Sequence, residues 1–392
     1  MDKFADIRRQ LDELEAANLL RSLRVVNSID GPLVRIDGSD RPLVNFSSND
    51  YLNIAGDPKV IQAVTEAVQR WGFGAGASRL ICGTTEAHVR LEEAFARFLH
   101  KEAALFLPCG WMANEAVLRT LPQKGDIVLM DKSNHASIID GVSASPAEFR
   151  TWRRDNPERL ARYLDSADYG RKFIVTESIF SMDGDAADLE ALVRLKNAHN
   201  AILIVDEAHS VGCMGKTGAG LAEKLGLLDD IDIIIAPCGK AMGASGAIVA
   251  ADRVVIDYLI NTARPFIYTT APSPVNCAAI SAAIEIVETE PQRREKRAKN
   301  AAYLRNHRSD KGMDIASSSS HIVPVIIGDS AEAVAVSGRL YERGFLVAAI
   351  RPPTVPRGSA RLRISVQSGH TAEQIDGLVD ALAEQPANQD CS

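Results

Sequence analysis

Short apolar runs alternate with amphipathic segments from about residue 56 onward. In residues 58–71 and 88–100, apolar side chains recur every three or four positions, which predicts helices. Residues 188–200 predict a crossover helix with Asp188 as its N-cap. Six other runs are almost continuously apolar, as is typical of strands buried on both faces of a parallel sheet, so we expect an α/β fold with a mostly parallel central sheet. These runs cover residues 103–108, 126–131, 173–178, 201–209, 232–237 and 246–251.

The two ends of the chain show a different pattern. Residues 1–23 predict a charged amphipathic helix, and short strands follow at 33–38 and 43–48. A helical stretch at about 274–308 leads to a smaller C-terminal α/β unit. Its expected elements are strands at 321–328, 345–350 and 361–366 and helices at 331–344 and 372–385. We therefore expect an N-terminal helix with short strands (1–48), a large domain (49–285) and a small C-terminal domain (286–392).

Composition narrows the class of protein. Of the 392 residues, 46% are hydrophobic and 24% charged, and the net charge of −7 argues against a nucleic-acid partner. The N-terminal segment lacks the apolar centre of a signal peptide, and no run reaches the roughly 18 apolar residues of a membrane span, so we expect a cytoplasmic protein. The cysteines show no metal-ligand spacing, which suits a reducing compartment and predicts no metal site. They are Cys82, Cys109, Cys213, Cys238, Cys277 and Cys391.

Polar side chains follow several of the predicted strands. Ligands of open α/β sheets bind at the carboxyl ends of the strands, and these ends carry His135, Asp206, His209 and Lys240. A lysine framed by apolar residues loses hydration, which lowers its pKa toward the range in which an amine attacks a carbonyl. Lys240 is therefore a candidate Schiff-base lysine, although a lone lysine in a turn is more often a plain surface residue.

Asp206 ends an apolar strand, where a carboxylate needs a partner that shares its site. A protonated pyridine nitrogen is such a partner, and in pyridoxal 5′-phosphate (PLP) chemistry it keeps the ring able to take up carbanion electrons. A helix cap or a magnesium ligand is the alternative, but the chain has no GxxxxGK[ST] motif. His209 is near enough to contact the ring's phenolic oxygen, and His135 could stack on its face. Either histidine alone is more often structural.

A phosphate group needs backbone donors. Residues 107–118 run from a strand through Gly110 into a helix, so the N–H groups of Gly110 and Trp111 would point toward an anion. The glycine-rich stretch 72–88 follows a helix and does not match GxGxxG, so we interpret it as a loop near the site rather than a dinucleotide site.

Together these landmarks resemble the PLP-dependent α-oxoamine synthases, a family of fold-type I PLP enzymes. The resemblance covers nearly the whole chain and implies an aspartate-aminotransferase-like fold, with PLP bound by the large domain. It rests on the motifs NFSSNDYLNIAG, GAGASRLICGTTEAHVRLEE, NHASIIDG, TESIFSMDGD, VDEAHSVGCMG, GKAMGASGAIVA, RPFIYTTAPSP and AIRPPTVPRGSARLRISV.

The resemblance also implies roles for individual residues. Lys240, His135 and Asp206 would be catalytic, and Arg351 would hold the amino-acid carboxylate. Thr269 and Thr270 would reach the phosphate of a neighbouring subunit, which implies a homodimer with shared active sites. The other cofactor contacts would be Gly110, Trp111, Ser181 and His209, and the other substrate contacts Arg21, Asn49, His135 and Thr354, with Arg21 and Thr354 on the acyl side.

Two residues depart from the family pattern. Pro237 stands where members usually have a threonine that binds the phosphate, and Cys109 stands where they usually have a serine. Neither residue offers a hydroxyl donor. We therefore expect weaker cofactor retention than in a threonine-bearing relative.

The activity implied is that of an acyltransferase. It would condense L-alanine with pimeloyl-CoA, or the pimeloyl-carrier protein, with loss of CO₂ and CoA, giving 8-amino-7-oxononanoate for biotin biosynthesis. A sister synthase of the 2-amino-3-ketobutyrate CoA ligase or serine palmitoyltransferase type is the alternative, and a fold-type I aminotransferase is another. A non-catalytic PLP-binding regulator is disfavoured, because Lys240 is present and no basic DNA-binding region is added.

Overall fold

The chain forms two compact units in the computed structural model. The model describes residues 2–165, 169–310 and 314–384. The large unit comprises the described parts of 52–181 and 186–295. The small unit comprises the described parts of 1–51, 182–185 and 296–392. The described residues before Leu52 and after Glu295 therefore belong to one unit, whereas the sequence pattern predicts separate N-terminal and C-terminal parts.

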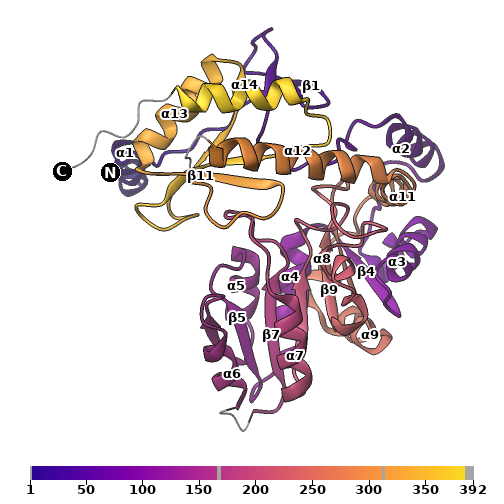
Figure 1. Ribbon diagram of the computed structural model, residues 1–392. Coiled ribbons are helices and arrows are strands. Elements are labelled where there is room, and N and C mark those ends of the chain that lie inside the picture. The colour runs from indigo at the N-terminus through magenta and orange to yellow at the C-terminus, as the bar shows by residue number, and fades with distance from the viewer. Residues whose placement is uncertain (1, 166–168, 311–313, 385–392) are drawn as a thin grey trace. The chain divides into compact units, whose positions relative to one another are not determined.

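A seven-stranded sheet forms the centre of the large unit (Figure 1). Strand β10 is antiparallel to both of its neighbours, and all other pairs, from β9 to β6, are parallel. The mostly parallel sheet expected from the apolar runs is thus confirmed. In spatial order the strands are β4 (Ala103–Leu107), β10 (Ala247–Ala251), β9 (Ile233–Pro237), β8 (Ile202–Asp206), β7 (Lys172–Glu177), β5 (Ile127–Asp131) and β6 (Glu148–Trp152).

Strand β6 has no counterpart among the strands expected from the sequence. It lies at the edge of the sheet and pairs only with β5. Its residues Glu148, Phe149 and Arg150 are exposed, so the segment lacks the continuous apolar run that marks the inner strands. An edge strand can carry charged side chains because these face solvent. A search for continuous apolar runs therefore does not identify β6.

Helices pack on the strands of the large unit. Helix α4 packs against α5 and against strands β4, β9 and β10 (Figure 1). Helix α7 begins at the expected N-cap, where the Asp188 carboxylate accepts the Ala191 N–H at 2.9 Å. Val117, Val128 and Ile204 lie in one buried core cluster of this unit. The helices are α2 (Pro58–Trp71), α3 (Glu86–Phe98), α4 (Gly110–Leu118), α5 (Ala136–Ser143), α6 (Pro157–Asp165), α7 (Leu189–His199), α8 (Leu221–Lys224), α9 (Arg253–Thr262), α10 (Arg264–Ile267) and α11 (Pro274–Thr289).

The long helix expected at 274–308 consists of two helices, α11 and α12 (Pro291–Asp310). A proline disfavours helical backbone in the residue before it. Glu290 accordingly leaves the helical region, with φ −119° and ψ 61°, and α12 begins at Pro291. The boundary between the two units falls within α12, after Glu295.

The small unit contains two sheets. In the first, β1 (Val26–Asp30), β2 (Leu33–Ile36) and β3 (Leu43–Asn45) are antiparallel, and β12 (Phe345–Leu346) pairs in parallel with β3. In the second, β14 (Ala360–Ser365) lies between β11 (Ile322–Gly328) and β13 (Ala348–Ile350), antiparallel to both. The other helices are α1 (Ala5–Ala16), α13 (Ser330–Glu342) and α14 (Ala372–Ala383). No helix of the described residues is long and apolar enough to span a membrane.

Candidate active site

The parallel strands bring the expected cofactor residues to one edge of the central sheet. Asp206 is the last residue of β8 and pairs in register with Glu177 of β7 and Ile235 of β9. His135 follows β5, and Lys240 follows β9. Because adjacent parallel strands end at the same edge, these side chains are neighbours. The charges of Asp206 and Lys240 both act on the His135 ring.

The candidate residues differ in exposure. Asp206 and His209 are each 4% exposed, and Lys240 and Ser181 are half-buried. His135 is exposed, but partial burial of its ring lowers its pKa; Asp206 opposes this effect and Lys240 adds to it. The imidazole is therefore neutral near pH 7.

Two N–H donors hold the Asp206 carboxylate. The Ala208 backbone donates to Oδ1 at 2.9 Å, and the Asn114 side chain donates to Oδ2 at 2.9 Å. A carboxylate oxygen has more than one lone pair, so each oxygen can accept a further hydrogen bond. Asp206 can therefore bind an N–H group of a ligand while keeping both protein contacts.

His135 is fixed by the loop that precedes α5. Its backbone N–H donates to Glu177 Oε1 at 2.6 Å, and its Nδ1 accepts the Ser137 N–H at 3.2 Å as the N-cap of α5. Asn134 ties this loop to the sheet, because its side chain donates to the Val175 carbonyl at 3.0 Å. Burial, together with the charge of Asp206, raises the pKa of Glu177.

The expected phosphate donors lie at the start of α4. Gly110 is the first residue of this helix, and Cys109, its N-cap, makes no side-chain capping hydrogen bond. A Cβ atom on Gly110 would lie 3.1 Å from Pro237 Cγ, so the two departures from the family pattern lie beside the same helix start. The Trp111 ring lies edge-on to His135, with 6.0 Å between the ring centroids. The helix N-terminus is thus next to the histidine.

These residues fit PLP. The large unit offers a carboxylate with accepting capacity, a neutral imidazole, a lysine and an open helix N-terminus. This cofactor requires an acid for its ring nitrogen and a flat side chain against its ring. It also requires an amine for its aldehyde and N–H donors for its phosphate. In the described residues, no group of three or more His, Cys, Asp or Glu is arranged to hold a metal ion.

The glycine-rich segment before α3, residues 72–85, holds the segment that carries Thr269 and Thr270. Ser78 and Thr270 form an antiparallel bridge, and the Ala271 N–H donates to the Ala77 carbonyl at 2.9 Å. Thr269 is half-buried and Thr270 is exposed. Residues 72–85 therefore support the two threonines, whereas residues 86–88 of the expected loop are the start of α3. That residues 72–85 lie near the active site stays a prediction.

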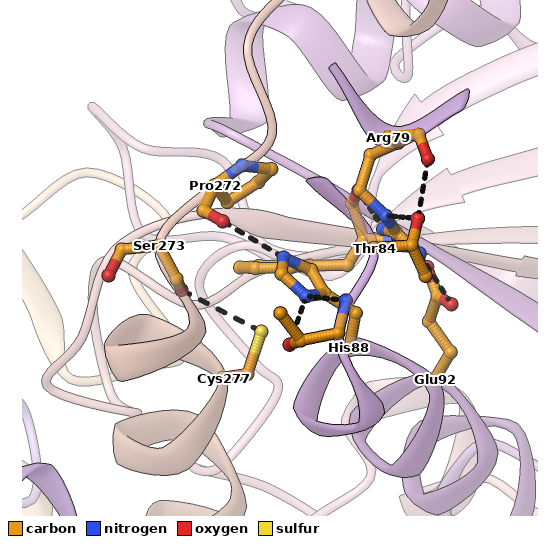
Figure 2. Close-up of polar contacts among 9 residues, drawn as sticks. Arg79, Thr84, His88, Glu92, Pro272, Ser273 and Cys277 are labelled. Atoms are coloured by element: carbon orange, nitrogen blue, oxygen red, sulfur yellow. Dashed lines mark hydrogen bonds and ion pairs between the residues drawn. The ribbon is translucent and has the colours of Figure 1, made fainter. Parts of the chain in front are cut away.

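His88 joins these two segments, and Arg79 joins the glycine-rich segment to helix α3 (Figure 2). His88 Nε2 lies 2.9 Å from the Pro272 carbonyl oxygen, and His88 Nδ1 accepts the Thr85 N–H at 3.2 Å. Arg79 forms a two-point ion pair with Glu92, with N–O distances of 2.9 and 3.0 Å. Arg79 and His88 are buried, so the anchor does not depend on surface contacts.

Of the substrate residues expected from the resemblance, His135 lies in the large unit, and the other four lie in the small unit and form two groups. Arg351 donates to the carbonyls of Asn18 and Leu20, and Arg21 Nη2 donates to the Pro352 carbonyl at 3.4 Å. Burial and the neighbouring Arg21 lower the pKa of Arg351. The Thr354 N–H donates to the Arg351 carbonyl at 3.2 Å, so Arg21, Arg351 and Thr354 are neighbours.

Asn49 belongs to the second group. Its Oδ1 accepts a hydrogen bond from Arg363 Nη1 at 3.1 Å and another from the Tyr51 hydroxyl at 2.9 Å. Arg363 is 7% exposed and its Nη1 also donates to Ser365 Oγ at 2.8 Å. The guanidinium that touches Asn49 is therefore that of Arg363, a residue that the sequence reasoning did not single out.

Comparisons with known proteins show the family of the chain. The model of the aminotransferase class I and II family matches residues 41–382, so the chain belongs to this family of enzymes. Within it, the chain is 45% identical over 377 residues to the 8-amino-7-oxononanoate synthase of Anaeromyxobacter dehalogenans, covering 96% of this chain and 94% of the relative. It is 42% identical over 385 residues to the 8-amino-7-oxononanoate synthase of Saccharophagus degradans, covering 98% and 97%.

A solved structure resembles the whole fold. A serine palmitoyltransferase variant from S. paucimobilis, with a bound PLP–myriocin aldimine, superimposes with a TM-score of 0.91 at 29% identity. The match covers 97% of this chain and 96% of that chain. The fold-type I architecture expected from the sequence motifs is therefore confirmed.

Proposed function

We propose that the chain is a PLP-dependent acyltransferase that condenses L-alanine with pimeloyl-CoA, or the pimeloyl-carrier protein, to give 8-amino-7-oxononanoate, CoA and CO₂. This reaction would serve biotin biosynthesis. The observation that carries the proposal is the set of Lys240, Asp206 and His135 at the strand ends, in a chain 42–45% identical to synthases of that name. The serine palmitoyltransferase neighbour shares the fold at a lower identity of 29%, which favours the alanine-dependent reaction over the sister alternative.

The residues of the large unit would have different roles at the cofactor. When bound, PLP supplies the electron sink that stabilises negative charge at the amino-acid Cα. Asp206 would hold the ring nitrogen with the accepting capacity left beside its two N–H donors. Lys240 Nζ would hold the cofactor and would accept the proton from the amino-acid Cα. The neutral His135 would lie against the ring, His209 would contact its phenolic oxygen, and Ser181 would lie beside the cofactor.

The start of α4 would bind the phosphate. The N–H groups of Gly110 and Trp111 lie at the positive end of the helix dipole, where an anion is stabilised. Pro237 adds no donor beside them, so the helix start and the threonines of a neighbouring subunit would carry most of the phosphate contacts.

The small unit would bind the two substrates. Arg21 and Arg351 place two cations beside Thr354, which suits the carboxylates of an amino acid and of a pimeloyl chain. Arg351 and Asn49 would serve the amino acid, and Arg21 and Thr354 the acyl group. Binding both substrates through carboxylates would align the Cα–H bond and the thioester for reaction.

A homodimer with shared active sites completes the proposal. Large apolar side chains are exposed beside the segment of Thr269 and Thr270: Ile81 is 80% exposed and Tyr268 73%. Large exposed apolar side chains favour an interface here, and a second copy of the chain is the partner that would bring the threonines to another site. A cytoplasmic location remains a prediction from the sequence.

Product identification tests this function. Purified protein with PLP is mixed with alanine, glycine or serine and with pimeloyl-CoA or palmitoyl-CoA, and products are identified by mass spectrometry. We expect 8-amino-7-oxononanoate from alanine and pimeloyl-CoA, with stoichiometric release of CoA. Condensation with serine or glycine at a higher rate would assign the chain to a sister synthase, and transfer of an amino group without condensation would assign it to the aminotransferases.

A further inference from the structure

A chain of hydrogen bonds links Asp206 to His135 through two buried residues. Asn114 Nδ2 lies 2.9 Å from Asp206 Oδ2 and 3.0 Å from Ser137 Oγ. Ser137 Oγ in turn lies 2.8 Å from His135 Nδ1. Asn114 is 2% exposed and Ser137 is 1% exposed, so water does not compete for these contacts. Asn114 projects from α4 and Ser137 from α5, two helices that pack against each other.

The partners determine where each hydrogen of this chain lies. A carboxylate only accepts, so Asn114 must present its NH₂ group to Asp206, and its second hydrogen goes to Ser137 Oγ. The Ser137 backbone N–H donates to His135 Nδ1 at 3.2 Å, so Nδ1 is an acceptor. The Ser137 hydroxyl must then donate to Nδ1 as well. The proton of the neutral His135 ring is left on Nε2.

The orientation of Asn114 leaves one atom unsatisfied. Its Oδ1 is buried and has no hydrogen-bond partner among the described residues. A buried acceptor without a donor costs free energy, so its presence requires a compensating contact. Turning the amide over would place Oδ1 against the Asp206 carboxylate and would break both Nδ2 contacts. The two donated bonds therefore explain the orientation.

We propose that Asn114 and Ser137 are positioning residues that fix the Asp206 carboxylate and the His135 ring relative to each other and keep the His135 proton on Nε2. The inference rests on the proposed function, in which Asp206 and His135 contact the cofactor ring. Asn114 lies one helical turn beyond Gly110 in α4, so this helix also links the ring acid to the phosphate donors at its start. One rigid element thus positions the groups for both ends of the cofactor.

Cofactor affinity measured without substrates tests the coupling. The dissociation constant of PLP is determined by absorbance for the wild type, Ser137→Ala, Asn114→Ala and the double variant. We expect each single substitution to weaken binding by about 3- to 10-fold, as the loss of a buried hydrogen bond does. Because the two residues act through one chain, the double variant should lose less than the product of the two single losses. Ser145→Ala is the matched control, since the Ser145 hydroxyl donates at 2.8 Å to the Val142 carbonyl at the other end of α5.

The outcomes separate positioning from a general loss of stability. The inference is overturned if Ser137→Ala binds PLP as tightly as Ser145→Ala. It is also overturned if the loss of PLP affinity in the double variant equals the full product of the two single losses. If the variants lose PLP affinity in the coupled way but the wild type makes no condensation product, the positioning role is supported and the proposed reaction is wrong.

The cofactor-free protein gives a second, independent readout. Nitrogen-15 NMR of histidine-labelled protein reports which ring nitrogen carries the proton, and His135→Gln assigns the signal. We expect His135 to carry its proton on Nε2, and we expect the Nδ1 signal to shift in Ser137→Ala but not in Ser145→Ala. A proton on Nδ1 in the wild type would contradict the chain, whatever the protein's activity and even if PLP does not bind.

Discussion

Asn49 and Arg363 form a hydrogen bond within the small unit, with 3.1 Å between Asn49 Oδ1 and Arg363 Nη1. Arg363 reaches Tyr51 and Ser365 with the same guanidinium, so its planar fork fixes several polar groups at once. This relationship places Arg363 next to a residue expected to serve the amino-acid substrate.

Arg363→Lys keeps the charge of this residue but loses the fork. We expect the KM for alanine to rise by about 10-fold, because Asn49 loses its donor, with a smaller effect on kcat. Steady-state kinetics at saturating acyl-CoA measure both constants. Arg357→Lys, at an exposed arginine of the same unit, should leave both unchanged. An unchanged KM in Arg363→Lys would remove Asn49 and Arg363 from the amino-acid site.

Pro237→Thr should strengthen cofactor binding. Pro237 ends β9 beside Gly110, where a hydroxyl would add a donor near the start of α4. We expect the PLP dissociation constant to fall by about 3- to 10-fold, as one added hydrogen bond to a phosphate allows. Pro237→Ala removes the proline ring without adding a hydroxyl and should not strengthen binding. Equal affinities of the threonine and alanine variants would show that the departure from the family pattern has no consequence for the phosphate.

His88 should make the large unit sensitive to acid. Burial, reinforced by Arg79, lowers the pKa of His88 to about 4, whereas an unfolded chain binds this proton near pH 6.5. The contribution of His88 to stability is therefore present above about pH 6.5 and is lost as the pH falls toward 4, because only the unfolded chain takes up the proton.

We expect the free energy of unfolding to decrease more between pH 7 and pH 5 in the wild type than in His88→Gln, by up to about 2 kcal/mol. Urea titrations at the two pH values measure this difference. His100→Gln, at an exposed histidine, serves as the control. The same pH dependence in the wild type and His88→Gln would show that the anchor to Pro272 does not require a neutral ring.

Ile81→Glu should weaken the proposed homodimer. The side chain is 80% exposed in the loop that supports Thr270, and a charge there opposes burial against a second copy. Sedimentation analysis should show a shift toward monomer, and PLP affinity should become dependent on protein concentration. Val254→Glu, at an exposed valine of α9, should do neither. A dimer of unchanged stability in Ile81→Glu would place the interface elsewhere.

Polar residues at the ends of buried strands can be located from the sequence because they interrupt runs of apolar residues. Asp206 is the last residue of buried strand β8, and Lys240 follows the end of buried strand β9 by three residues, so both stand out against apolar runs. Glu177 ends β7 in the same way, so the same reasoning was sufficient to find it. The break between α11 and α12 was also readable from Pro291.

Other residues of the site could not be found in this way. Asn114 lies inside a helix and carries no local signal, because its role depends on contacts with Asp206 and Ser137. Arg363 sits in a strand whose alternating arginines resemble an exposed face, yet every residue of β14 is buried. Such residues become visible only when distant segments are brought together.

The most direct test of the account is chemical trapping at Lys240. The purified protein is loaded with PLP, reduced with borohydride, digested and analysed by mass spectrometry. We expect a pyridoxyl adduct on the peptide that contains Lys240, and we expect Lys240→Ala to yield neither this adduct nor turnover while remaining folded. An unmodified Lys240 in fully loaded protein, or full activity of Lys240→Ala, would contradict the central claim.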